Sequence, residues 1–381
     1  MKQLSISQTD VLFANGIYPI EFLLFYDRAY DTYDRAFDTT RLREALRRLS
    51  SSWWPIFGVY EDGTIRAEQY DEAAVFLEES RDEVFHIPAS EMECFESCRR
   101  FSKPDLNRLF HVRVIRFRNG VMVIPKLNHM VGDGYSYFTF LAFLAAAARP
   151  SPIPLKSSLL NLFVKPHHNR TCLKKYQLDV APPPPALPPA DVTIECEEIP
   201  ISEVQSIADA CSDPAGIRVS TNDVLSAMAL KKIAGSQEAA GSASLNLSIP
   251  IDVRRLVPDF GRRFIGNALQ LHSLSLDLDT VLNAPIGEIA TSIRTSMPTI
   301  TRNSYLEYLT GLEERIDQGD PDAFRPFDPD TGCLVTNLTR MPTDRLDFGS
   351  GPPALIYPLT AGKHAAALMR HKDRFVLRLV H

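Results

Sequence analysis

The sequence predicts a mixed α/β or α+β fold, because strand-like and helix-like patterns are interspersed in both halves of the chain. A single hydrophobic core stops growing at roughly 250 to 300 residues, so a chain of 381 residues indicates two domains. The stretch APPPPALPPA at 181–190 predicts an extended linker, since proline removes backbone donors and favours an extended path. We expect a first domain over 1–180, this linker, and a second domain over 191–381. The alternative for 181–190 is a rigid surface loop within one domain.

A strand, a tight loop and a buried helix are predicted around the segment NHMVGDG at 128–134. Residues 111–117 alternate apolar and basic side chains, a turn follows at 119–120, and 121–127 resume as a more buried strand. Residues 135–148 are apolar nearly all round, which is typical of a helix buried inside a protein. The histidine of this segment is therefore expected between a strand and a helix.

Helical spacing elsewhere predicts two further helices. The first is amphipathic, ends before Pro55, and places these residues on one face: Leu42, Ala45, Leu46 and Leu49. The second begins at Ser220 and Asp223, which have the S-x-x-D spacing of an N-terminal capping arrangement. Strand-like runs are expected at 245–249, 334–338 and 375–380.

Charge and cysteine spacing exclude several classes of function. A formal net charge of -6, with no basic stripe interleaved with aromatics, argues against nucleic acid as a partner. The six cysteines show no CxxC pair or other zinc-ligand spacing, so we predict no metal site. The N-terminus lacks the pattern of a signal peptide, and the longest apolar run is too short to span a bilayer. These features predict a cytoplasmic protein that does not act at a membrane.

His129 is the histidine that stands in a chemically meaningful group, with Asp133 four residues later and Gly134 beside it. A histidine suits proton abstraction from a hydroxyl near neutral pH because its ordinary pKa is about 6.5. The neighbouring glycine allows a substrate to approach closely, and the carboxylate can fix the local turn through charge-assisted hydrogen bonds. HxxxDG specifies only three positions, so the motif alone leaves open a structural histidine beside a helix-capping Asp133.

The order of motifs along the whole chain decides between these alternatives. The sequence resembles the BAHD acyltransferases, which belong with chloramphenicol acetyltransferase and peptide-synthetase condensation domains in a wider superfamily. The resemblance rests on these segments: LSISQTDVLFANG, LREALRRLSSSWWPIFGVY, RLFHVRVIRFRNGVMVIPKLNHMVGDGYSYFTFL, VSTNDVLSAMALKKI, IPIDVRRLVPDF with FIGNA, and LVTNLTRMPTDRLDFGSG.

The resemblance implies two similar chloramphenicol-acetyltransferase-like domains joined by a crossover, with the active-site channel between them. Acyl-CoA and a small-molecule alcohol or amine, expected to be a specialised metabolite, would meet at His129. His129 would act as general base without a covalent acyl-enzyme. The resemblance further implies a monomer with acyl-CoA as a substrate and no tightly bound cofactor.

The resemblance also assigns roles to individual residues. Asp133 would hold the loop by an internal ion pair, and Gly134 would keep the channel open. The residues assigned to the side where the acyl-CoA donor binds are Asn267, Asp347, Gly349 and Arg254. Among them, Asp347 would be structural and would pair with Arg254, Arg255 being the alternative. Asn267 would lie near the donor channel or, equally well, in a buried hydrogen-bonded turn.

The sequence departs from the family pattern at two motifs in the second half of the chain. Ser350 replaces the tryptophan of DFGWG, and Leu338 stands where many members carry the tryptophan of T-S-W. The indole N–H of that tryptophan is missing, so Thr336, Asn337 or a backbone N–H are the candidate oxyanion donors. Hydrolysis on the same fold, a carrier-protein donor and a non-catalytic binding relative remain alternatives. The identities of acyl donor and acceptor are left open.

Overall fold

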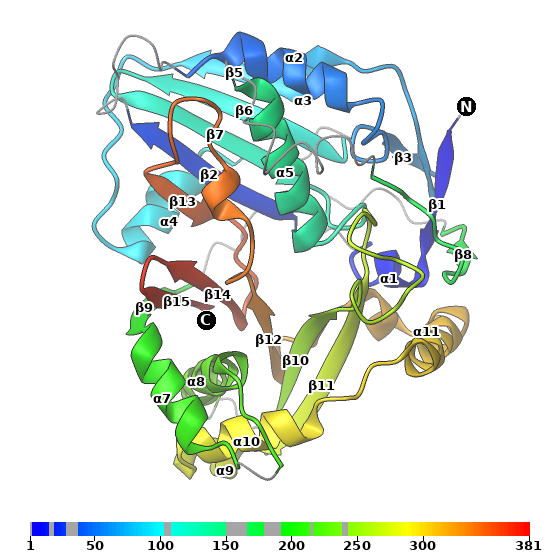
Figure 1. The fold of residues 1–381 in the computed structure, drawn as a ribbon, viewed down its shortest axis with the longest axis vertical. Helices are drawn as coiled ribbons and strands as arrows, with labels where there is room; N and C mark the ends of the chain where they lie inside the picture. The colour runs from blue at the N-terminus through cyan, green and yellow to red at the C-terminus, as the bar shows by residue number, and fades with distance from the viewer. Residues whose placement is uncertain are drawn as a thin grey trace.

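The computed structural model describes residues 2–14, 19–27, 37–102, 108–149, 166–178, 192–213, 216–237 and 243–381. Within these ranges the chain forms two large sheets, one above the other in Figure 1, each covered by helices. The predicted mixed α/β fold is confirmed. The predicted linker at 181–190 lies outside the described residues.

The upper sheet has five strands among the described residues, in the order β13-β2-β7-β6-β5. The strands are β2 (Ile20–Asp27), β5 (Phe76–Ser80), β6 (Phe110–Phe117), β7 (Gly120–Leu127) and β13 (Leu355–Pro358). The predicted hairpin is confirmed, since β6 and β7 pair antiparallel from Phe110 with Leu127 to Phe117 with Gly120. The edge strand β13 comes from the second half of the chain and pairs with β2.

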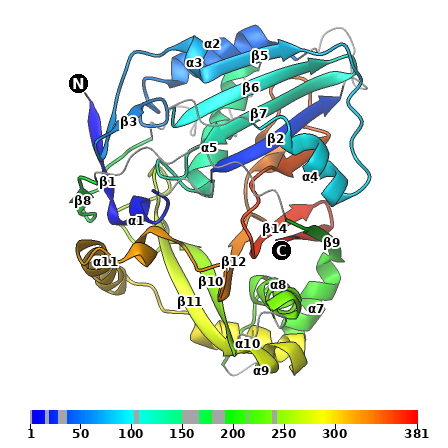
Figure 2. The same cartoon turned by 180° about the vertical axis from the view of Figure 1, so that it is seen from behind.

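Helices cover both faces of this sheet, which explains why every residue of β7 is buried. Helices α2 (Thr39–Leu49) and α5 (Gly134–Ala148) contact each other and lie on one face. Helix α4 (Glu91–Arg99) lies on the other, as comparison of Figures 1 and 2 shows. Successive residues of β7 alternate between the two cores, with Val123 in the first and Ile124 in the second. The predicted amphipathic helix is confirmed, with Leu42, Ala45 and Leu46 buried in α2.

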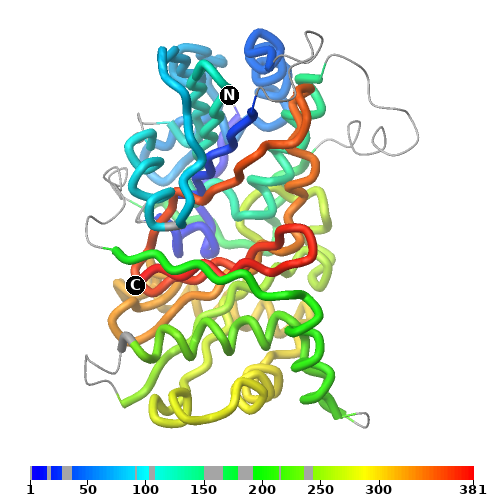
Figure 3. The backbone as a smooth tube through the Cα atoms, turned by 90° about the vertical axis from the view of Figure 1, so that its left-hand side faces the viewer, coloured from blue at the N-terminus to red at the C-terminus, as the bar shows by residue number. Residues whose placement is uncertain are grey.

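The lower sheet has six strands among the described residues, in the order β11-β10-β12-β14-β15-β9. They are β9 (Ile194–Pro200), β10 (Ser244–Asp252), β11 (Leu269–Asp277), β12 (Gly332–Asn337), β14 (Ala365–His371) and β15 (Arg374–Val380). All three predicted strand runs fall in this sheet. Figure 3 shows β9 running beside the β14–β15 hairpin across the middle of the molecule. Strand β15 lies between β14 and β9 and pairs antiparallel with each of them.

The lower sheet is packed by α7 (Ile201–Ala210), α8 (Thr221–Gln237), α9 (Leu278–Asn283) and α10 (Ile286–Ser296). The start of α8 is as predicted, since the amide and hydroxyl of Ser220 both donate to Asp223 at 2.7 Å. A small sheet, β3-β4-β1-β8, the helix α11 and several short elements complete the described fold. These are β1 (Gln3–Ser7), α1 (Gln8–Val11), β3 (Val59–Glu61), β4 (Thr64–Arg66), α3 (Glu72–Val75), β8 (Lys175–Tyr176), α11 (Arg302–Asp317), η4 (Pro321–Phe324) and η5 (Thr343–Arg345).

Candidate active site

His129 lies in the loop that joins β7, which ends at Leu127, to α5, which begins at Gly134. The loop is closed locally because the Asn128 side chain accepts a hydrogen bond from the Met130 amide at 3.0 Å. The predicted position of the histidine between a strand and a helix is therefore confirmed. The loop faces a cavity between the two sheets.

The imidazole of His129 is stacked on Phe13, with ring centroids 3.7 Å apart and an interplanar angle of 19°. Its Nδ1 is buried, while the side chain lines the cavity and is partly exposed there. Burial lowers the pKa of His129 below its ordinary value, despite the nearby carboxylates of Asp133 and Asp10. The ring is thus neutral at pH 7, as a proton acceptor must be.

Asp133 forms the N-cap of α5 and a buried bidentate pair with Arg254, with N–O distances of 2.8 and 2.9 Å. Its carboxylate also accepts hydrogen bonds from the amides of Ser136 and Ala268. Burial opposes ionisation of Asp133, yet Arg254 and these two amides together hold the pKa of the carboxyl below its ordinary value. The internal ion pair predicted for Asp133 is present, and its partner is Arg254.

Arg254 joins the loop to the second half of the chain through further contacts. Its guanidinium donates to Asp252, to the hydroxyl of Ser136 and to the carbonyls of Phe264 and Gly266. The arginine is 2% exposed, so its guanidinium is shielded from solvent. They position the backbone that carries His129 and give Arg254 a structural task.

Asn267 is fully buried behind the histidine. Its side-chain amide donates to Asp10 at 2.8 Å and to the carbonyls of His129 and Met130 at 3.0 and 3.2 Å. Asp10 in turn pairs with the buried Arg170 and accepts from the amide and hydroxyl of Ser7. Of the two expectations for Asn267, its contacts match the buried hydrogen-bonded turn.

Sequence reasoning missed Asp10, Ser136 and Arg170 as supports of this loop. A usable signal existed for Asp10, because Ser7 and Asp10 have the same S-x-x-D spacing that predicted the start of α8 at Ser220 and Asp223. Ser136 and Arg170 had no comparable signal, since their partners lie far away along the chain.

The predicted pair between Asp347 and Arg254 is wrong. Asp347 pairs instead with Arg149, the C-cap residue that follows α5, at 2.9 Å, and its main-chain carbonyl accepts from the same guanidinium. The reason is that Arg254 is already occupied by Asp133. The other carboxylate oxygen of Asp347 accepts from the amides of Gly349 and Gly351, which have φ angles of 112° and 99°. These left-handed angles account for the two glycines of DFGSG. Among the described residues that line the cavity with His129, Arg254 is present, whereas Asn267, Asp347 and Gly349 are not.

The cavity beside His129 has a volume of about 220 Å³ and is lined mainly by apolar side chains. Leu334 and Thr336 of β12 line the cavity, as do Asn337 at the end of the strand and Leu338 just after it, while Cys333 and Val335 point into the core of the lower sheet. Gly134 lines the same cavity, and a methyl group there would meet only Leu338, at an ordinary 3.6 Å. Space in the cavity, rather than packing of the protein, therefore explains this glycine.

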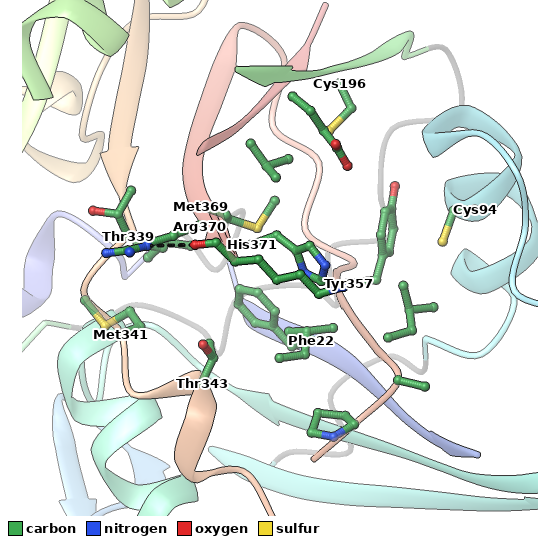
Figure 4. Close-up of a pocket in the computed structure, with 18 of the residues that line it drawn as sticks. Phe22, Cys94, Cys196, Thr339, Met341, Thr343, Tyr357, Met369, Arg370 and His371 are labelled. Carbon is green, nitrogen blue, oxygen red and sulfur yellow. Dashed lines mark hydrogen bonds between the residues drawn. The ribbon is translucent and has the colours of Figure 1, made fainter. Parts of the chain in front are cut away.

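A second, larger cavity of about 1000 Å³ adjoins the first (Figure 4). It is bordered by β13, the β14–β15 hairpin and the segment before α4, including Tyr357, Met369 and His371. The two cavities share four lining residues: Phe22, Phe138, Leu338 and Met341. They are separated by little more than a layer of side chains.

The described ranges contain no group of three or more His, Cys, Asp or Glu residues that could hold a metal ion. None of the helices in the described part of the chain is long and apolar enough to cross a membrane.

The model of a protein family described as the Transferase family matches residues 1–374. This chain belongs to that family, the BAHD acyltransferases. Solved structures share its fold at low sequence identity. Vinorine synthase has a TM-score of 0.75 and 18% identity, over 100% of this chain and 90% of that one. TRI101 of F. sporotrichioides, solved with coenzyme A and T-2, has a TM-score of 0.71 and 16% identity, over 99% and 94%. The first condensation domain of the CDA synthetase has a TM-score of 0.58 and 15% identity, over 99% and 89%. A comparison with curated proteins gave no match.

Proposed function

We propose that this protein transfers an acyl group from acyl-CoA to a hydroxyl or amine of a small molecule, with His129 as general base. The observation that carries this proposal is a histidine that lines a largely apolar cavity and stands on a loop fixed by a buried ion pair. Family membership supports the reaction class, and the coenzyme A bound to TRI101 supports the choice of donor.

In the proposed reaction, Nε2 of His129 accepts the proton of the acceptor as its oxygen or nitrogen attacks the thioester carbonyl. The tetrahedral oxyanion then collapses with cleavage of the C–S bond, and the imidazolium returns the proton to the CoA thiolate. The lowered pKa of His129 keeps the ring ready to accept a proton at neutral pH. The stacking on Phe13 fixes the plane of the ring during both transfers.

Thr336 is the preferred oxyanion donor among the candidates of β12. The Asn337 side chain is committed elsewhere, because its amide donates to Asn222 and its carbonyl accepts twice from Thr339. Thr336 lines the cavity, and its hydroxyl makes no hydrogen bond to the described residues. Removal of one oxyanion donor costs about 3 to 4 kcal/mol in other enzymes, so Thr336→Val should reduce kcat by roughly a hundredfold or more.

The two adjoining cavities offer separate room for the donor and the acceptor, with His129 in the smaller one. We include in this proposal the division into domains 1–180 and 191–381, a monomeric protein and a specialised metabolite as acceptor.

The deciding experiment measures thiol release from a panel of acyl-CoAs, with and without candidate alcohols and amines, in wild type and His129→Ala. Release that depends on the acceptor and is lost in the variant supports transfer with His129 as base. Release without an acceptor points to hydrolysis, and no release from any donor opposes the use of acyl-CoA.

The pH dependence of kcat/KM provides a second test. Because the pKa of His129 is lowered, kcat/KM should still be at its maximum at the ordinary histidine pKa of 6.5. It should fall only when the pH is lowered further and His129 becomes protonated.

A further inference from the structure

Four arginines are buried among the described residues: Arg113, Arg170, Arg254 and Arg378. The first three each have a carboxylate partner, respectively Glu79, Asp10 and Asp133. Arg378, on β15, has no acidic partner within 4.0 Å among the described residues. It is 2% exposed, and it lines the same cavity as His129.

The contacts of Arg378 leave one edge of its guanidinium unused. One terminal nitrogen, Nη1, donates a 3.3 Å hydrogen bond to the carbonyl of Thr360, and the group lies 5.4 Å from the ring centre of Tyr357. The other two nitrogens, Nε and Nη2, are buried without a hydrogen-bond partner in the described structure. Arginine remains charged in proteins, so this group cannot relieve the cost of burial by losing its proton.

Nε and Nη2 form the side of the guanidinium that holds a carboxylate through two parallel hydrogen bonds. The chain shows this geometry at Arg302, whose Nε and Nη2 donate to the two oxygens of Asp259 at 2.8 and 3.1 Å. At Arg378 the donors are the same, but the carboxylate is missing from the described residues.

The neighbours of Arg378 on β14 are small. On β14 its cross-strand partner is Ala367, and the next pair on that side of the hairpin is Ala365 with Val380. Both alanines and Val380 line the cavity together with Arg378. A ligand in the cavity can therefore reach this part of the β14–β15 hairpin.

We propose that Arg378 binds a carboxylate carried by one of the two substrates, so that this enzyme selects an acidic acyl donor or an acidic acceptor. Calling this ligand a substrate rests on the proposed transferase function. The binding of an acidic ligand to Arg378 can be tested without turnover. Arg378 is assigned to substrate selection, and proton transfer remains with His129.

The test measures equilibrium binding by calorimetry in the His129→Ala background, with two matched pairs of probes. Succinyl-CoA is compared with butyryl-CoA for the donor, and hydroxybenzoate with hydroxybenzamide for the acceptor. We expect the acidic member of one pair to bind roughly tenfold to a hundredfold more tightly, the range for a hydrogen-bonded charge pair. The pair that shows this preference identifies which substrate carries the carboxylate.

Substitutions connect the preference to Arg378. Arg378→Gln should abolish it, and Arg378→Lys should restore part of it because the charge returns without the planar fork. The matched control is Arg374→Gln, an exposed arginine on the same strand, which should retain the preference in full. Equal binding of acidic and neutral probes in both pairs, or a preference that survives Arg378→Gln, would overturn the proposal. Thiol release tests the transferase function separately.

Thermal unfolding without ligand distinguishes a binding role from a structural one. An unpaired buried charge destabilises the empty protein, so Arg378→Met should raise Tm by a few degrees. A fall in Tm would show that Arg378 chiefly supports the fold through Thr360 and Tyr357, and would oppose the proposal.

Discussion

Helix α5 is tied to the second half of the chain at both ends, and the two ties differ in burial. At its N-terminus Asp133 pairs with Arg254, and the two side chains are 3% and 1% exposed. At its C-terminus Arg149 pairs with Asp347, with exposures of 29% and 26%. Each charge has the sign that the helix dipole favours at its end.

The N-terminal end of α5 is held in place more rigidly than its C-terminal end. A buried ion pair must offset a large desolvation cost, which requires that nearly every donor and acceptor be satisfied. The buried end meets this requirement through Ser136, Ala268, Phe264 and Gly266, and it is the end that carries His129. The other end is only partly buried, so solvent weakens its ion pair, and it serves mainly to hold the DFGSG loop.

The largest expected effect comes from removing the buried arginine. Arg254→Ala leaves Asp133 charged without its partner, and we expect a loss of about 3 to 5 kcal/mol in the free energy of unfolding. The matched control at the other end, Arg149→Ala, should cost about 1 kcal/mol or less. Urea denaturation of both variants measures the difference. Equal losses would show that burial does not distinguish the two ends.

Acid should weaken the buried end selectively. Because the pKa of Asp133 is lower in the folded protein than its ordinary 3.8, the ionised carboxylate stabilises the fold above that pH. This contribution is lost as the pH falls below 3.8 towards the folded-state value. Unfolding free energy measured from pH 5 downwards should therefore decline more steeply in wild type than in Asp133→Asn. Parallel curves would contradict the assignment.

Two glycines beside Asp133 should separate stability from activity. An added methyl at Gly132 would lie 2.9 Å from the Cβ of Ser136, so Gly132→Ala should cost about 1 to 3 kcal/mol by overpacking. At Gly134 the methyl would project into the cavity, so Gly134→Ala should leave Tm nearly unchanged and lower kcat/KM. Thermal unfolding and thiol release on both variants give the test, and a stable, fully active Gly134→Ala would remove the proposed role of this glycine.

The smallest effects are expected at the partly buried end, where Arg149 pairs with Asp347. Asp347→Ala removes the ion pair and the acceptor of the Gly349 and Gly351 amides, for an expected cost of about 1 to 2 kcal/mol. It should therefore be more destabilising than Arg149→Ala, and the gap should persist at high salt because the amide bonds are not screened. A gap that disappears in salt would indicate that the ion pair alone matters.

Local pattern in the sequence was sufficient for much of the fold. The alternation of residues 111–117, the turn at 119–120 and the apolar run of α5 predicted a hairpin, a loop and a buried helix in the right order. These elements depend on periodicity and on neighbours a few residues away, which a sequence displays directly. His129 could be proposed for the same reason, because its motif and the order of the other motifs are visible along the sequence.

Tertiary structure decided which charges meet. The sequence suggested Asp347 as the partner of Arg254, yet Arg254 lies against Asp133, and Asp347 lies at the far end of α5. The unpaired Arg378 was likewise invisible, since nothing near it in the sequence shows that it is buried without a carboxylate. Ion pairs and cavities form between residues that are distant along the chain, so their partners are fixed only when the sheets and helices pack together.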